Sequence, residues 1–145
     1  MSTRVLVPMD DSAMAAEALT FTLETVRAAE VTVLHVAGGP TSFMGDAASL
    51  ALSDDVDSAV AERAEPVFTR AREIADELGR EVATEVDLGS PAKTIIEHAE
   101  RFDLIVIGSH NSGLASRLLM GNVTETVTEK APIPVTVVPN EAESR

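Results

Sequence analysis

The sequence predicts an α/β protein built on one doubly wound, five-stranded parallel sheet. Two observations lead to this prediction. Short apolar runs that suit buried strands alternate five times with segments that carry helical periodicity. The segments between the runs are long enough for the crossovers that parallel strands require. Neither an internal repeat nor an interdomain linker is visible, so residues 1–145 are interpreted as a single domain.

The first strand is expected at Arg4–Pro8, where a short apolar run precedes two acids and a serine. Asp11 or Ser12 is placed to cap the next helix, whose apolar stripe continues to about Ala29. A second strand is expected at Val31–Val36. It is apolar on both faces, which favours a sheet that is covered on both sides.

Residues 38–53 contain glycine, proline and small polar residues and are interpreted as a loop. A helical stripe then runs from Val56 to Leu78 and ends at Gly79, a typical helix-terminating residue. Pro66 interrupts the stripe, so we expect either a kink or two successive helices. Alternation at 81–88 predicts the third strand.

Ser90-Pro91 is a helix start, with a capping residue followed by proline at the first helical position. A fourth strand is expected at Leu104–Ile107, a last helix at Leu118–Ala131 and a fifth strand at Val135–Val138. The order of elements is typical of a Rossmann-like sheet with right-handed crossovers.

The formal net charge of −13 disfavours binding to nucleic acid or to anionic membranes. No apolar run approaches the length of a membrane span. The absence of cysteine excludes disulfides and thiolate metal sites and fits the cytoplasm. Abundant acids with few lysines resemble proteins of salt-loving archaea; an ordinary acidic surface, kept soluble by its charge, is the alternative.

In sheets of this kind, ligands bind beyond the carboxyl ends of the strands, where the strand order reverses. Gly108-Ser-His-Asn111, followed nine residues later by Gly121-Asn122, predicts a loop that runs into the start of a helix. Free amides at such a start can hold a phosphate without lysine. The alternative is a tight turn, with a glycine that allows close packing.

Six stretches, in order between Arg4 and Pro139, share one pattern. They are Val5–Ser12 (VLVPMDDS), Leu34–Val36 (LHV), Leu88–Ala92 (LGSPA), Asp103–His110 (DLIVIGSH), Ser116–Gly121 (SRLLMG) and Ala131–Val135 (APIPV). Together they resemble the universal stress protein family. The resemblance implies an adenine nucleotide alpha hydrolase-like fold and a stress-response function.

ATP-binding members of that family carry Gly, two residues, Gly, nine residues, then Gly and Ser or Thr. Gly108 and Gly121 match this pattern, whereas Asn111 and Asn122 replace its second glycine and its hydroxyl residue. Asparagine tolerates a left-handed backbone, but its side chain fills space beside a phosphate. Asn122 still offers an amide donor.

The resemblance therefore implies a modified adenine-nucleotide site, for ATP or a related nucleotide, with Mg²⁺ conceivable beside the paired acids. The implied nucleotide-binding residues are Pro8, Met9, Asp10, Val36, Gly108, Ser109, His110, Asn111, Gly121, Asn122, Val123 and Thr124. His35 is interpreted as a satisfied polar group and His98 as solvent-facing. No two histidines have metal-site spacing.

Two functions follow from the resemblance. One is a regulatory, nucleotide-binding stress-response module that is not an enzyme, because no Walker-type lysine is present and Arg117 is the one cation of the loop. The other is a dimeric interaction or chaperone-like protein without the phosphate cradle. A phosphatase or flavoprotein is disfavoured, since cysteine and a flavin-stacking aromatic pair are absent. Family members pair their last strands, so Ile133–Pro139 is the expected homodimer contact.

Overall fold

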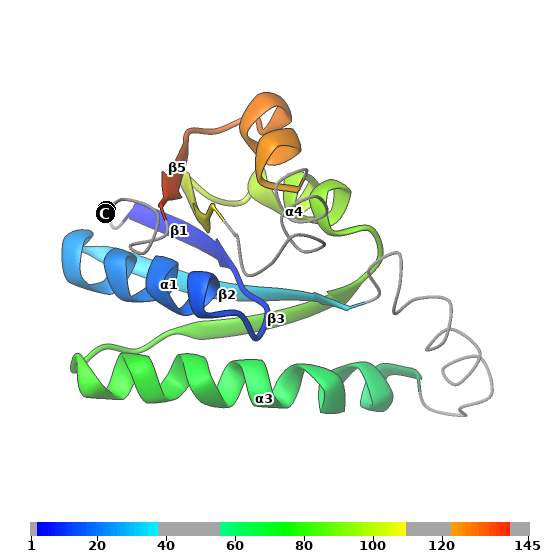
Figure 1. Cartoon of the computed structure of the whole chain (residues 1–145), viewed down its shortest axis with the longest axis horizontal. Coiled ribbons are helices and arrows are strands. Elements are labelled where there is room, and N and C mark those ends of the chain that lie inside the picture. Colours follow the sequence, from blue (N-terminus) through cyan, green and yellow to red (C-terminus); the bar gives the residue numbers. More distant parts are fainter. Residues whose placement is uncertain (1–2, 38–55, 110–122, 140–145) are drawn as a thin grey trace.

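The computed structural model describes residues 3–37, 56–109 and 123–139, without the side chains of 56–59. Within these ranges five parallel strands form one sheet in the order β3-β2-β1-β4-β5, with helices on both faces (Figure 1). The predicted fold class is thereby confirmed. The strands are β1 (Thr3–Pro8), β2 (Ala29–Ala37), β3 (Ala83–Leu88), β4 (Leu104–Gly108) and β5 (Val135–Val138), and the helices are α1 (Ala13–Thr25), α3 (Val56–Glu77), α4 (Pro91–Ala99) and residues 123–130.

Two apolar cores lie on opposite faces of the sheet because neighbouring strand residues point to opposite sides. Val5 and Val7 of β1 pack under α1 and α3, whereas Leu6 packs with α4 and the 123–130 helix. All three of these side chains are fully buried. Figure 1 shows α3 along one side of the sheet and α4 on the other. The strands that are apolar on both faces therefore lie in a sheet that helices cover on both sides, as predicted.

Helix α1 begins where the sequence indicates and ends earlier than predicted. The Ser12 hydroxyl accepts from the Ala15 N–H at 3.1 Å, so Ser12 is the N-cap. The helix stops at Thr25 rather than near Ala29. Arg80, which follows α3, donates to the carbonyls of Leu23 and Ala29 at 2.7 and 3.3 Å. This arginine satisfies a carbonyl in the last turn of α1 and also contacts the first residue of β2.

Helix α3 runs through Pro66 as one element, so the alternative of two successive helices was wrong. Proline removes one backbone donor, but the apolar stripe continues on both sides of it and keeps the helix packed on the sheet. The buried stripe comprises Val60, Ala64, Val67, Phe68, Ala71, Ile74 and Ala75. Gly79 has φ +67° and ends the helix, as predicted. Its N–H donates to the Asp76 carbonyl, and the Arg80 N–H donates to the Ala75 carbonyl.

Strand β3 and the final helix differ from their predicted bounds. Strand β3 begins at Ala83, two residues later than expected, and lies at one edge of the sheet. The final helix ends at residue 130, one residue short of the prediction, and its expected start at 118–122 lies outside the described residues. The predicted 38–53 loop also lies outside them. Strand β5 has the expected bounds and forms the opposite edge.

Candidate functional site

The chain moves outward from β1 through β2 to β3 and then returns to the other side of β1 with β4 and β5. The strand order therefore reverses between β1 and β4, the position at which doubly wound sheets bind ligands. A cleft of about 500 Å³ opens at the carboxyl ends of the strands. The described residues that line it are Pro8, Met9, Asp10, Asp11, Ser12, Met14, Ala15, Leu34, His35, Val36, Ala37, Arg63, Pro66, Val67, Pro91, Ile95, Ile107, Gly108, Val123 and Thr124.

The turn between β1 and α1 forms one rim of this cleft. One carboxylate oxygen of Asp10, Oδ1, accepts from the Ser12 N–H at 2.9 Å. Because Ser12 supplies the helix cap, neither acid is needed for that task, and Asp11 is exposed. The carboxylate of Asp10 thus has a fixed orientation beside the cleft, where it can accept from a bound hydroxyl or amine.

The end of β2 offers main-chain groups to the same cleft. The Leu34 carbonyl accepts from the Met9 N–H at 2.8 Å, so Leu34 turns its polar backbone groups toward β1. Alternate residues of a parallel ladder face the same neighbour, and Val36 therefore faces the β1 side as well. Strand β1 ends at Pro8, whose register partner is Leu34. Val36 lies past that end and lines the cleft, with one donor and one acceptor on its backbone.

His35, next to Val36, is a hydrogen-bonded polar group, as the sequence analysis predicted. Its Nδ1 lies 2.9 Å from the Met9 carbonyl oxygen. The contact ties the end of β2 to the turn that follows β1. His35 nevertheless lines the cleft, which the sequence alone did not indicate.

Gly108 is needed for packing whether or not a ligand binds beside it. A Cβ built at this position would lie 2.8 Å from the carbonyl oxygen of Met14 in α1. Strand β4 therefore approaches the helix backbone more closely than any side chain allows. The packing alternative raised for this glycine is correct, and it is compatible with a second role in the cleft.

Thr124 and Ser109 complete the described end of β4. The Thr124 hydroxyl donates to the Gly108 carbonyl at 3.0 Å, which links the 123–130 helix to the strand. The Ser109 N–H donates to the Val138 carbonyl at 2.9 Å. Among the described residues, the Ser109 hydroxyl is buried without a hydrogen-bond partner, and Ser109 is not one of those that line the cleft.

The structure brings seven of the twelve predicted site residues to one cleft: Pro8, Met9, Asp10, Val36, Gly108, Val123 and Thr124. His110, Asn111, Gly121 and Asn122 lie outside the described residues, so their role stays a prediction. Sequence reasoning missed Arg63 on α3 and the Pro91–Ile95 turn of α4. The helix start at Ser90-Pro91 directly after a strand was the available signal for the latter.

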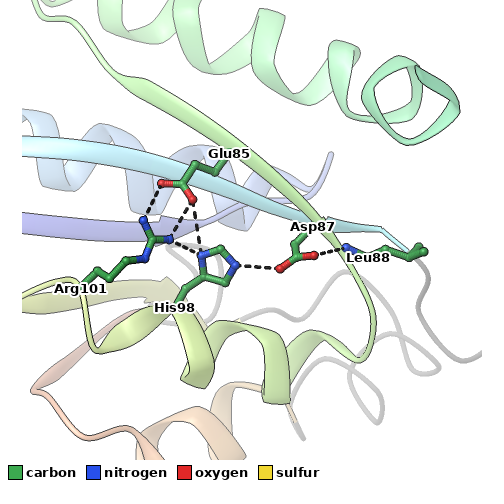
Figure 2. Close-up of polar contacts among 5 residues, drawn as sticks. All are labelled: Glu85, Asp87, Leu88, His98 and Arg101. Atoms are coloured by element: carbon green, nitrogen blue, oxygen red, sulfur yellow. Dashed lines mark hydrogen bonds and ion pairs between the residues drawn. The ribbon is translucent and has the colours of Figure 1, made fainter. Parts of the chain in front are cut away.

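His98 is not solvent-facing, contrary to the prediction, because its side chain is only 16% exposed. Figure 2 shows its ring between Asp87, Glu85 and Arg101. Nε2 lies 2.9 Å from Asp87 Oδ2, and Arg101 donates to Nδ1. Asp87 and Glu85 are two apart on edge strand β3, so both point toward α4. The cluster joins α4 to the sheet edge.

Two charge effects accompany this cluster. The hydrogen bond from His98, with a second from the Leu88 N–H, lowers the pKa of Asp87. The Glu85 carboxylate, at 2.8 Å, raises the pKa of Arg101 above its usual value. Asp87 and Arg101 therefore stay ionised at neutral pH, and His98 bridges the carboxylate of the one and the guanidinium of the other.

In the described part of the chain, no group of three or more His, Asp or Glu side chains is arranged to hold a metal ion. Asp10 and Asp11 alone are too few protein ligands for a dedicated Mg²⁺ cage. None of the helices described is long and apolar enough to cross a membrane.

The fold and the cleft define a doubly wound α/β protein with a ligand-type cleft at the switch point of its sheet. The model of the universal stress protein family matches residues 1–139. The chain belongs to this family.

Individual relatives agree with that assignment. One universal stress protein of Methanocaldococcus jannaschii is 30% identical over 139 residues, which cover 93% of this chain and 81% of that protein. A second from the same organism is 29% identical, covering 95% of each chain. Its solved structure has a TM-score of 0.74 at 28% identity, covering 97% of this chain and 98% of that one. The universal stress protein UspA of Lactobacillus plantarum has a TM-score of 0.70 at 29% identity, covering 94% and 97%.

Proposed function

We propose that this protein binds an adenine nucleotide in the switch-point cleft and acts as a regulatory stress-response module. The observation that carries the proposal is the position and composition of the cleft. Its volume of about 500 Å³ falls within the range of small-molecule sites. The backbone of Val36 offers a donor beside an acceptor, which complements the amine and ring nitrogen on one edge of adenine.

The other walls suit the rest of a nucleotide. The 123–130 helix contributes Val123 and Thr124 to the cleft, and free amides near a helix start attract phosphate. Asp10 can accept from a ribose hydroxyl or an amine. Arg63 on α3 supplies a positive charge at the cleft of a strongly acidic chain.

Two solved proteins of the same fold are described with adenine nucleotides. One is a universal stress protein in complex with cAMP, with a TM-score of 0.66 at 22% identity. The other is an Arabidopsis thaliana family member with AMP bound, with a TM-score of 0.65 at 18% identity. At these identities the likeness concerns the fold, so the proposal rests on the cleft of this chain.

We expect binding with little or no hydrolysis. Turnover of a phosphoanhydride needs a positioned base or water-orienting group and usually a cation on the transferring phosphate. The cleft's one described basic side chain, Arg63, comes from α3 rather than from a phosphate loop. We place the protein in the cytoplasm, in keeping with its lack of cysteine.

The second candidate function is a dimeric interaction protein that binds no nucleotide. Strand β5 favours it, since this strand is an edge of the sheet among the described residues and Val137 on it is 38% exposed. Pairing with the same strand of a second copy would give hydrogen-bond partners to the backbone groups of that edge. Light scattering at low and molar salt should give a dimer mass, and Val137→Lys should lower it; a monomer under both conditions excludes the contact.

A thermal-shift series separates the two functions. ATP, ADP and AMP, each with and without Mg²⁺, are compared with GMP and inorganic phosphate in high-salt buffer. A ligand at 100 times its Kd adds about 2.7 kcal/mol to the free energy of unfolding. If no adenine nucleotide shifts the midpoint, the nucleotide proposal fails. If the shift is weak, Asn111→Gly with Asn122→Ser should strengthen it.

A further inference from the structure

His35 is the one histidine among the described residues that line the cleft. Val31 and Val33 of β2 point into the core under α1 and α3, so His35, two residues further on, points to the same side. Pro66 and Val67 of α3 and Met14 of α1 border the cleft on this side. The imidazole therefore lies at the junction of strand ends and helices that forms the cleft wall.

The hydrogen bond to Met9 determines which ring nitrogen carries the proton. A backbone carbonyl only accepts, so Nδ1, at 2.9 Å from it, must be the donor. In the neutral ring, Nε2 is then an unprotonated acceptor with a lone pair. Nε2 makes no hydrogen bond with any residue that the structure describes. The cleft thus contains an acceptor whose ring is held in place by the protein.

We infer that His35 Nε2 is a specificity-determining acceptor, which receives a hydrogen bond from an N–H or O–H donor of the bound nucleoside. This inference rests on the proposed nucleotide function. The donor is the exocyclic amine of adenine or a ribose hydroxyl, and both present the same chemistry to Nε2. A base with a carbonyl in place of the amine has no donor there, so an acceptor held in this way selects against it.

The charged groups that line the cleft together with His35 belong to two segments. Asp10 and Asp11 lie on the turn after β1, and Arg63 lies on α3; all three line the same cleft. The acids compete with Nε2 for ligand donors, whereas Arg63 can only donate. Removing Nε2 therefore removes one acceptor from a wall that retains the acceptor oxygens of Asp10.

Asparagine at position 35 separates the two roles of the ring. Its amide nitrogen occupies nearly the place of Nδ1 and can still donate to Met9, but no atom replaces Nε2. Phenylalanine keeps the ring and removes both nitrogens. His98→Asn is the matched control, since His98 does not line the cleft.

The affinities of wild type, His35→Asn and His98→Asn are measured by calorimetry with AMP, 2′-deoxy-AMP, 3′-deoxy-AMP and purine riboside 5′-monophosphate, which lacks the amine. His35→Asn should bind AMP about 3- to 10-fold more weakly, the worth of one hydrogen bond. For the one analogue that lacks the donor, wild type and His35→Asn should bind equally. His98→Asn should match wild type, and His35→Phe should also unfold at a lower temperature.

The outcomes separate this inference from the function on which it rests. If wild type binds AMP and His35→Asn binds it equally well, Nε2 makes no contact and the inference fails alone. An undiminished penalty with all three analogues also overturns it, because the effect then comes from a disturbed wall. A wild type that binds no adenine nucleotide overturns the proposed function together with the inference.

Discussion

Replacing Gly108 with alanine tests whether this glycine is required by the fold before any ligand arrives. The new methyl group would lie 2.8 Å from the Met14 carbonyl oxygen and 3.1 Å from its carbonyl carbon. Both atoms belong to the backbone of α1, so the clash cannot be relieved by a change of side-chain rotamer. Overpacking of this kind costs about 1–3 kcal/mol. For a chain of this size, that corresponds to a midpoint lower by roughly 3–12 °C.

The assay is thermal and urea unfolding of the nucleotide-free protein, followed by circular dichroism. Gly108→Ser and Gly108→Val extend the series, and the loss of stability should grow with side-chain size. If Gly108→Ala unfolds within 1 °C of wild type, α1 and β4 are not in the close contact described. The glycine would then have no structural role of its own, and its presence would have to be explained by the ligand.

Three further changes test contacts outside the apolar core. Thr124→Val should lower the free energy of unfolding by about 1–3 kcal/mol, because the Gly108 carbonyl loses a donor; Thr124→Ser should not, and equal losses in urea unfolding would exclude the hydrogen bond. Arg80→Met removes two charged hydrogen bonds to carbonyls and should cost about 1.5–3 kcal/mol by the same measurement, whereas an unchanged midpoint would refute that role. Asp87 has a lowered pKa in the folded state, so it stabilises the protein above its unfolded pKa of about 3.9 and loses this contribution as the pH falls through its folded pKa. Asp87→Asn should therefore be less stable than wild type at pH 7, by no more than about 1 kcal/mol for a half-exposed group, and equal to it near pH 2; a difference that persists in acid would contradict the ion pair with His98.

The strands and the parallel, doubly wound character of the sheet could be predicted because both depend on local patterns. Runs such as Val5–Val7 are apolar on both faces, and that pattern arises only where helices cover both sides of a sheet. The caps at Ser12 and Gly79 were predictable for the same reason, since each acts within one turn of its own helix.

Features that depend on distant residues were missed. The Leu23 carbonyl near the end of α1 accepts from Arg80, which is 57 positions away, and no local pattern near Thr25 indicates this contact. His98 was assigned to solvent because its helix position alone does not reveal Asp87 and Glu85 on the neighbouring strand. Pro66 was expected either to kink the helix or to divide it in two, and α3 runs through it as one element.

The candidate site was predictable in outline. Strand ends and the glycine at 108 indicated the switch point, where the cleft lies in the structure, whereas Arg63 and His35 line that cleft only through the packing of α3 over β2. The two asparagines that replace motif residues, Asn111 and Asn122, lie outside the described residues. Their effect on affinity is a question for the binding experiments above.

The central claim is that the switch-point cleft takes up an adenine nucleotide. An NMR titration of the ¹⁵N-labelled protein with AMP tests it most directly. We predict saturable shifts at the amides of Val36, Met9 and Gly108, with the amides of Asp87 and Arg101 unchanged. Absence of any saturable shift at millimolar AMP, or shifts confined to residues outside the cleft, would contradict the account.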